Sequence, residues 1–286
     1  ASFGSRALFP HLRPVAYLNH SAISPPSLPV QSAVQAVLVD YAERGVDAFV
    51  SWMAQRDRLR ADLAVLINAR TEDIGFVPNT TQGIIHMAMC MPWRPGDRIV
   101  LFEGEFPTNI TPWQRAAKEF DLELVFLSLA GFDDTGNGLA RLKAELRKGV
   151  RLVAVSAVQF QTGQRLPLDD MGQLCREHGA LFSVDAIQAC GVVPVDVQAS
   201  QIDFLACGSH KWLMGLEGCG FIYIRPERVR ALVPRLAGWL SHEDGLGFLF
   251  DGSGHLRYDR PIRKRADLCS ADPARGCFPL VWTLSP

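Results

Sequence analysis

The length, composition and charge of the chain restrict the classes of protein to which it can belong. With 286 residues, 48% of them hydrophobic, it is long enough to bury a large core, which excludes a disordered chain. Its 29 basic and 30 acidic side chains give a formal charge of -1, so no general basic field favours nucleic acid as a partner.

Helical and strand patterns alternate along the chain. Residues 29–45 place apolar side chains three and four positions apart, which predicts an amphipathic helix from near Pro29 to near Gly45. The segment "NTTQG" (79–83) predicts a helix N-terminus, and a second amphipathic helix is expected over 167–180. Runs rich in Val, Ile, Leu and Phe predict strands buried on both faces at 97–106, 122–129, 150–160, 180–186 and 202–209.

This order of elements predicts an α/β fold, a mostly parallel sheet sandwiched by helices. Ligands of such sheets bind beyond the carboxyl ends of the strands. Three polar residues follow predicted strands there: Gln159, Asp185 and Lys211. Taken alone, Asp185 is equally well explained as a helix N-cap and Lys211 as a lysine with its amine in water, while Gln159 alone indicates nothing. Together, an acid and an amine on neighbouring strand ends can converge on one bound molecule.

Several motifs resemble one known family. The segments "SVDAIQ" and "GSHKWLMGLEGCGFIYI", with "NTTQG", "EGEFPTN" and "YLNHSAISPP" upstream, are similar to the class V aminotransferase family of pyridoxal-phosphate enzymes. That family includes cysteine desulfurases and isopenicillin N epimerase-like proteins. The resemblance runs from about Tyr17 to about Asp267 and implies the large domain of a fold-type I pyridoxal-phosphate transferase.

The resemblance implies a role for each polar residue that follows a strand. Lys211 would form the Schiff base with the aldehyde of pyridoxal 5'-phosphate, and its burial would favour the neutral amine that can attack a carbonyl. Asp185 would pair with the pyridine nitrogen and keep it protonated, so that the ring accepts electrons from the substrate. Gln159 and Gln188 would lie near the ring hydroxyl oxygen.

The resemblance also implies residues for the cofactor's phosphate and ring face. Thr80 and Thr81 would bind the phosphate at a helix N-terminus, with His210 and Ser209 as further donors. An ordinary helix N-cap is the structural alternative for the first two. Many relatives read Ser-Gly-His-Lys where this chain reads Gly-Ser-His-Lys, so Ser209 departs from the pattern. Phe106 would stack on the cofactor, with core packing as its alternative.

The family resemblance leaves the reaction open. We expect aminotransferase-like chemistry on an amino acid, with epimerase or lyase activity as the alternative. A desulfurase needs a mobile nucleophilic cysteine, and five cysteines lie in predicted helices, strands or strand ends: Cys90, Cys175, Cys190, Cys207 and Cys219. Cys269 and Cys277 lie in a predicted loop whose sequence does not match a desulfurase loop. A third hypothesis is a truncated relative without catalytic competence.

The cysteines and the apolar runs indicate where the protein works. The seven cysteines have no paired CxxC spacing, which indicates reduced thiols and neither a disulfide framework nor a metal site. No apolar run is long enough to span a membrane, and "ASFGSRALFPHLRP" lacks the pattern of a secretion signal. We therefore expect a cytoplasmic protein without a metal, a membrane partner or a nucleic-acid partner.

The last part of the chain departs from the family pattern. We expect an N-terminal arm (1–28), a large cofactor-binding domain (29–230) and a partial small domain with an irregular tail (231–286). Family members usually supply an arginine for the substrate carboxylate and a Gly-Thr segment for the partner subunit's phosphate from the small domain of a homodimer. Neither is found here, and "LCSADPARGCFPLVWTLSP" replaces the expected sequence. We therefore predict weak or no turnover.

Overall fold

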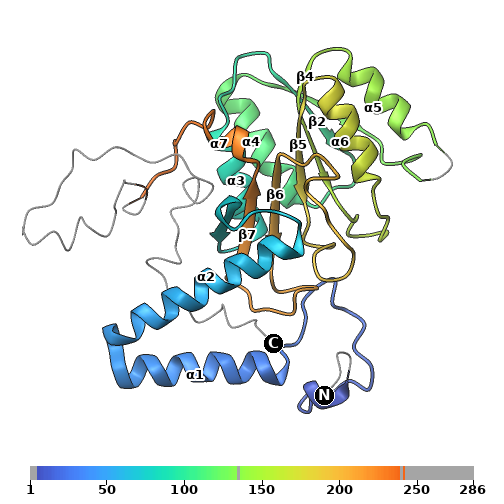
Figure 1. Cartoon of the computed structure of the whole chain (residues 1–286). Helices are drawn as coiled ribbons and strands as arrows, with labels where there is room; N and C mark the ends of the chain where they lie inside the picture. The colour runs from blue at the N-terminus through green and yellow to red at the C-terminus, as the bar shows by residue number, and fades with distance from the viewer. Residues whose placement is uncertain (1–4, 134–135, 239–240, 242–286) are drawn as a thin grey trace, which may run out of the picture.

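A seven-stranded sheet with helices on both faces forms the centre of the computed structural model, which describes residues 5–133, 136–238 and 241 (Figure 1). The strand order is β1-β7-β6-β5-β4-β2-β3. From β6 to β3 all neighbours are parallel, whereas β7 is antiparallel to both β6 and β1. The strands are β1 Ile74–Val77, β2 Arg98–Phe102, β3 Glu123–Leu127, β4 Val150–Ser156, β5 Leu181–Asp185, β6 Phe204–Gly208 and β7 Gly220–Ile224. The predicted mostly parallel sheet is confirmed.

All five predicted strands are present, but the prediction that each is buried on both faces is wrong for β3. This strand is exposed or half-buried along its whole length, because it is the last strand of the sheet and pairs with β2 on one side. β1 and β7 were not predicted. They are short and fully buried, and their antiparallel pairing continues the sheet beyond β6.

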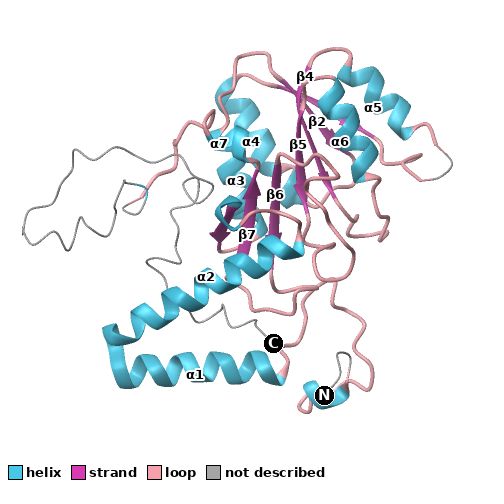
Figure 2. Ribbon diagram, in the orientation of Figure 1, coloured by secondary structure: helices cyan, strands magenta, loops and turns pink. Residues whose placement is uncertain are grey.

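The helices cover both faces of the sheet (Figure 2). The predicted helices at 29–45 and 167–180 correspond to α1 and α6. No helix among the described residues is long and apolar enough to cross a membrane. The helices are α1 Leu28–Arg44, α2 Phe49–Leu66, α3 Thr80–Cys90, α4 Thr111–Phe120, α5 Gly138–Leu146, α6 Leu168–Glu177 and α7 Pro226–Val229. Short 3-10 helices span Arg6–Leu8, Gly45–Ala48, Thr71–Asp73 and Pro107–Asn109.

Two hydrophobic layers hold the helices on the sheet. Side chains of α2, α5 and α6 pack on one face, and those of α3 and α4 pack on the other. The approach of α3 is close: a Cβ atom on Gly83 would lie 2.7 Å from Ile222 Cγ2 in β7 and 3.0 Å from Ala206 Cβ in β6. Glycine at this position therefore lets α3 lie against the sheet, with its N-terminus at the carboxyl end of β6.

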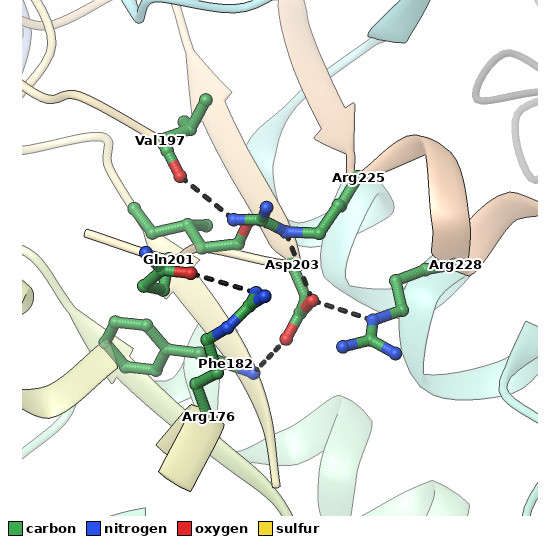
Figure 3. A network of polar contacts seen from close by, with 8 residues as sticks. Arg176, Phe182, Val197, Gln201, Asp203, Arg225 and Arg228 are labelled. Carbon is green, nitrogen blue, oxygen red and sulfur yellow. Dashed lines mark hydrogen bonds and ion pairs between the residues drawn. The ribbon is translucent and has the colours of Figure 1, made fainter. Parts of the chain in front are cut away.

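A polar network lies at the end of the sheet where β5 and β6 begin (Figure 3). Asp203 is buried just before β6 and accepts a hydrogen bond from the main-chain N–H of Phe182 in β5 at 2.9 Å. Its other oxygen accepts from Arg228 Nε at 2.8 Å and lies 3.4 Å from Arg225 Nε. Arg225 also donates to the carbonyl of Val197. One buried carboxylate thus joins β5, β6, the end of β7 and α7, and we assign this network to structure.

The chain beyond α7 returns to α3. Val233 N–H donates to the carbonyl of Cys90 at 2.8 Å, and the Arg235 guanidinium donates to the carbonyls of Met89 and Met91. The first residues of the predicted small domain therefore pack on the large one. The rest of that predicted region, including the irregular tail, lies outside the described residues apart from Ser241.

Candidate functional site

A cavity of about 460 Å³ opens beyond the carboxyl ends of the parallel strands. Its walls come from the start of α3, the segments after β2, β4, β5 and β6, and the N-terminal segment. The structure brings together seven of the nine residues predicted from the sequence: Thr80, Thr81, Phe106, Asp185, Gln188, His210 and Lys211. Gln159 and Ser209 are not among the residues that line it.

Asp185 is the last residue of β5 and is only 3% exposed. Its Oδ1 atom accepts a hydrogen bond from the main-chain N–H of Ile187 at 3.0 Å, a local turn contact and not the cap of a described α-helix. Burial raises the pKa of the carboxyl to about 7, and the nearby Glu105 adds to the rise. A cationic group in the cavity would therefore stabilise the ionised form of Asp185.

Lys211 follows β6 and is half-buried in the same cavity. Burial lowers the pKa of its amine, while the attraction of Asp185 opposes this shift. Its Nζ atom lies 5.6 Å from the centroid of the Phe106 ring. A larger share of Lys211 is therefore neutral at a given pH than for a lysine in water, which makes the amine a better nucleophile.

The start of α3 offers donors to an anion. Asn79 caps the helix by accepting from the N–H of Gln82 at 2.8 Å. The first amides of a helix have no intrahelical acceptor, and Thr80 and Thr81, the first residues of α3, line the cavity. Thr80 Oγ1 is buried and has no hydrogen-bond partner, an unusual cost for a hydroxyl unless a ligand uses it. Thr81 Oγ1 lies 2.8 Å from Thr108 Oγ1.

His210 completes the polar side of the cavity. Burial and the neighbouring Lys211 lower the pKa of its imidazole. Taken together with the helix amides and the orphaned Thr80 hydroxyl, these groups suit a phosphate in chemistry and in position. The donor set therefore fits the phosphate of a small ligand, and the amine of Lys211 in the same cavity can react with a carbonyl group on that ligand.

Phe106 does not belong to the hydrophobic core. Its side chain is 44% exposed, and its ring meets the edge of Phe160 with centroids 5.2 Å apart. Both rings line the cavity. Core packing, the alternative explanation for Phe106, is therefore not what the structure describes, and the ring is free to stack on a planar ligand.

The side-chain amides of the two predicted glutamines form hydrogen bonds within the protein. Gln159 donates to the carbonyl of Gly104 at 2.6 Å and accepts from the N–H groups of Gln161 and Thr162. Gln188 donates to the carbonyl of Ser21 at 2.9 Å and accepts from Trp212 Nε1 at 2.8 Å. Both amides thus close loops around the cavity, and their predicted contact with a ring hydroxyl stays a prediction.

The side chain of Ser209 also has a hydrogen-bond partner within the protein. Its hydroxyl donates to the carbonyl of Leu216 at 2.8 Å. The unusual glycine before it is explained by space, because a Cβ atom on Gly208 would lie 3.2 Å from Thr80 Oγ1 and 3.4 Å from His210 Cε1. The swapped order of glycine and serine therefore leaves room around the orphaned hydroxyl, and the phosphate role of Ser209 stays a prediction.

Sequence reasoning missed Glu105. This side chain follows β2, is 9% exposed, and accepts hydrogen bonds from both the main-chain N–H (2.6 Å) and the hydroxyl of Ser156, the register partner of Asp185. Burial raises the pKa of Glu105. The carboxylate anchors the turn that presents Phe106. Two acids follow the apolar run of β2 in "LFEGEF", and the available signal was an acid, Glu105, directly before an aromatic residue at a strand end.

The remaining conspicuous side chains are structural. His86 is buried in α3 beside Gln82, with 2.8 Å between the two side-chain nitrogens, and burial lowers its pKa to about 4. All five cysteines in the described ranges are buried, and burial raises the thiol pKa of Cys175, Cys207 and Cys219. Cys269, Cys277 and Trp239 lie outside those ranges. No cluster of potential metal ligands occurs among the described residues.

Comparison with known proteins identifies the family to which this fold belongs. Residues 16–240 match the family model described as aminotransferase class-V. A probable cysteine desulfurase of Pyrococcus abyssi is 34% identical over 242 residues, covering 82% of this chain and 59% of that protein. The structure of a C-DES mutant with glycine covalently linked to the PLP cofactor matches with a TM-score of 0.85 and 26% identity, covering 98% of this chain and 73% of that one.

A second C-DES structure is described as a complex between the cystine C–S lyase and its reaction product cysteine persulfide. It matches with a TM-score of 0.83 and 26% identity, covering 96% of this chain and 72% of that one. The chain spans about three fifths of the curated relative from Pyrococcus abyssi. Because the family model covers most of the sequence, the chain belongs to the aminotransferase class-V family.

Proposed function

We propose that this chain is a pyridoxal 5'-phosphate-dependent enzyme, or part of one, that acts on an amino acid through Lys211. The observation that carries the proposal is one cavity that holds a half-buried amine, a buried carboxylate and an orphaned threonine hydroxyl at a helix N-terminus. The match of the C-DES structure, whose cofactor is named in its description, supports it.

Each residue has a task that follows from its surroundings. The bound cofactor supplies an electron-withdrawing ring that weakens the bonds to the substrate's α carbon. Asp185 would accept a hydrogen bond from the protonated ring nitrogen, and that charge would hold the carboxylate ionised despite its burial. Thr80, Thr81 and His210 would bind the phosphate. Lys211 would attach to the aldehyde and then give and take a proton at the α carbon.

Two reaction classes remain as proposals. Aminotransferase-like chemistry is the first, as expected from the sequence. Cleavage of a carbon–sulfur bond is the second, favoured by relatives described as a probable cysteine desulfurase and a cystine C–S lyase. All five described cysteines are buried, so within the sequence given a desulfurase thiol could come from Cys269 or Cys277, whereas a C–S lyase needs no enzyme thiol.

The attachment site can be tested directly. Borohydride reduction of the cofactor-loaded chain, followed by peptide mapping, should place a phosphopyridoxyl group on Lys211. Lys211→Ala should abolish it, and Lys118→Ala, at an exposed lysine on α4, should not. An adduct on a different lysine would contradict the assignment.

An amino-acid panel separates the reaction classes. Transamination would convert the cofactor to its pyridoxamine form and release an oxo acid, whereas C–S cleavage would release sulfide or a persulfide from cysteine or cystine. Rapid sulfide release that is lost in Cys277→Ser would favour a desulfurase. Release that survives replacement of both Cys269 and Cys277 would favour a lyase.

We also propose that the chain as given turns over poorly. No arginine lines the cavity in the described part of the chain, so a clamp for the substrate carboxylate is not in place there. A homodimer in the cytoplasm is the proposed form of the complete family member. Steady-state kinetics with light scattering on the 286-residue chain test this, and a soluble dimer with ordinary turnover would contradict it.

A further inference from the structure

The N-terminal segment reaches the main chain at Lys211. Ser24 is 4% exposed, and its main-chain N–H donates to the carbonyl of His210 at 2.7 Å. Its hydroxyl donates to the carbonyl of Lys211 at 2.6 Å. One residue thus holds two consecutive carbonyls, and the Lys211 carbonyl also accepts from the N–H of Met214 at 2.9 Å.

The direction of these bonds fixes the proton on His20. The Nδ1 atom of His20 lies 2.8 Å from Ser24 Oγ. A serine hydroxyl has one hydrogen, and that hydrogen must lie between Ser24 Oγ and the Lys211 carbonyl, because two oxygen acceptors so close would otherwise repel each other. His20 Nδ1 therefore carries a hydrogen and donates it to Ser24 Oγ. This arrangement polarises the hydroxyl and strengthens its bond to the Lys211 carbonyl.

A second set of contacts closes the same segment over the cavity wall. The His20 ring lies beside the Trp212 ring, with centroids 5.7 Å apart. Trp212 donates to Gln188, and Gln188 donates to the carbonyl of Ser21. Residues 20–24 are therefore fixed to the Lys211 segment at both ends.

We propose that His20 and Ser24 are positioning residues that hold the Lys211 main chain so that its amine points into the cavity. The inference rests on the proposed function. Neither residue needs to touch the cofactor to act in this way. Because a misplacement of a reacting group by about 1 Å can cost about 100-fold in rate, two hydrogen bonds at the root of the lysine are enough to matter.

The variants follow from the direction of each bond. Ser24→Ala removes the donor to the Lys211 carbonyl and should slow covalent attachment of pyridoxal 5'-phosphate by about threefold to tenfold, the loss typical of one hydrogen bond. His20→Asn keeps an N–H donor near the position of Nδ1 and should retain most of the rate. His20→Asp is nearly the same shape but only accepts, so it should slow attachment as Ser24→Ala does.

Two controls match these variants. Ser27→Ala removes a hydroxyl three residues away that makes no side-chain cap bond to α1, and His11→Asn changes an exposed histidine. Both should leave the rate unchanged. Thermal unfolding by circular dichroism shows whether each variant is folded at the assay temperature.

A ligand without the aldehyde separates positioning from general damage to the cavity. The dissociation constant of pyridoxamine 5'-phosphate, measured by fluorescence titration, should stay within about twofold of the wild-type value in all variants. Attachment rates are measured by absorbance after mixing the full chain with pyridoxal 5'-phosphate, and reduced peptides confirm Lys211 as the site.

The possible results are distinct. Slower attachment in Ser24→Ala and His20→Asp, with unchanged pyridoxamine 5'-phosphate binding and with rescue in His20→Asn, supports the proposal. Unchanged attachment in Ser24→Ala overturns it, as does an equal loss of both measurements. If the wild-type chain forms no adduct on Lys211, the proposed function fails and this inference fails with it.

Discussion

The buried carboxyl of Asp185 predicts how the stability of the ligand-free chain changes with pH. Its pKa is raised from 3.8 to about 7 by burial, so between these values the folded chain keeps a proton that the unfolded chain releases. The contribution of Asp185 to the free energy of unfolding is therefore fully present below about pH 4, where the carboxyl is protonated in both states. It is lost as the pH rises toward 7, because ionisation is then more favourable in the unfolded chain. At about 1.4 kcal/mol per pKa unit, the loss is on the order of 4 kcal/mol.

Asp185→Asn removes this titration and keeps an oxygen to accept from the N–H of Ile187. We expect the variant to lose less stability than the wild type between pH 4.5 and 7.5. Glu105, whose pKa burial also raises, and Lys211, whose pKa burial lowers, face residue 185 in both proteins. The difference between the two curves therefore reports the titration of Asp185 together with its electrostatic coupling to these two groups.

Urea unfolding followed by tryptophan fluorescence at several pH values provides the measurement. Asp62→Asn, at an exposed position on α2, is the matched control and should run parallel to the wild type. A difference between wild type and Asp185→Asn that does not change with pH would refute the reasoning. It would mean that the carboxyl is ionised in the fold or reaches water there.

Three further predictions concern a buried hydroxyl, a closely packed glycine and the buried thiols. Thr80→Val removes a buried hydroxyl without a partner, so it should leave the ligand-free chain as stable or up to about 1 kcal/mol more stable, while titration shows weaker pyridoxamine 5'-phosphate binding by about tenfold. Gly172→Ala should destabilise the chain by several kcal/mol in urea, because the new Cβ would lie 1.8 Å from the carbonyl oxygen of Ser200. Gly149→Ala, where nothing lies within 4 Å, should cost only the strain of its positive φ of 86°, about 1–2 kcal/mol, and an equal loss in both variants would contradict the clash. Iodoacetamide should leave all five described cysteines unlabelled in the folded chain, as read by peptide mapping, and label them in urea; rapid native labelling would show that the buried thiols are reachable.

Local sequence patterns were sufficient for much of the fold and for the main site residues. The spacing of apolar residues in α1 and the apolar runs of β2, β4, β5 and β6 depend on neighbours in the chain, so they can be read without knowing the tertiary structure. The rule that ligands bind beyond strand ends directed attention to Asp185 and Lys211, and the structure places both in one cavity.

Only the tertiary structure decided which elements would be buried and which side chains would form hydrogen bonds with each other. β3 has the apolar sequence of a buried strand, yet its place at the edge of the sheet leaves it partly exposed. The side-chain amides of Gln159 and Gln188 have hydrogen-bond partners within the protein, and the buried Glu105 carboxylate accepts from Ser156 at the end of β4. Ser24 lies 187 positions from Lys211 and bonds its carbonyl, because chain closure and packing bring the two together. Hydrogen bonds between such distant residues depend on the register and packing of whole elements, which no local pattern in the sequence encodes.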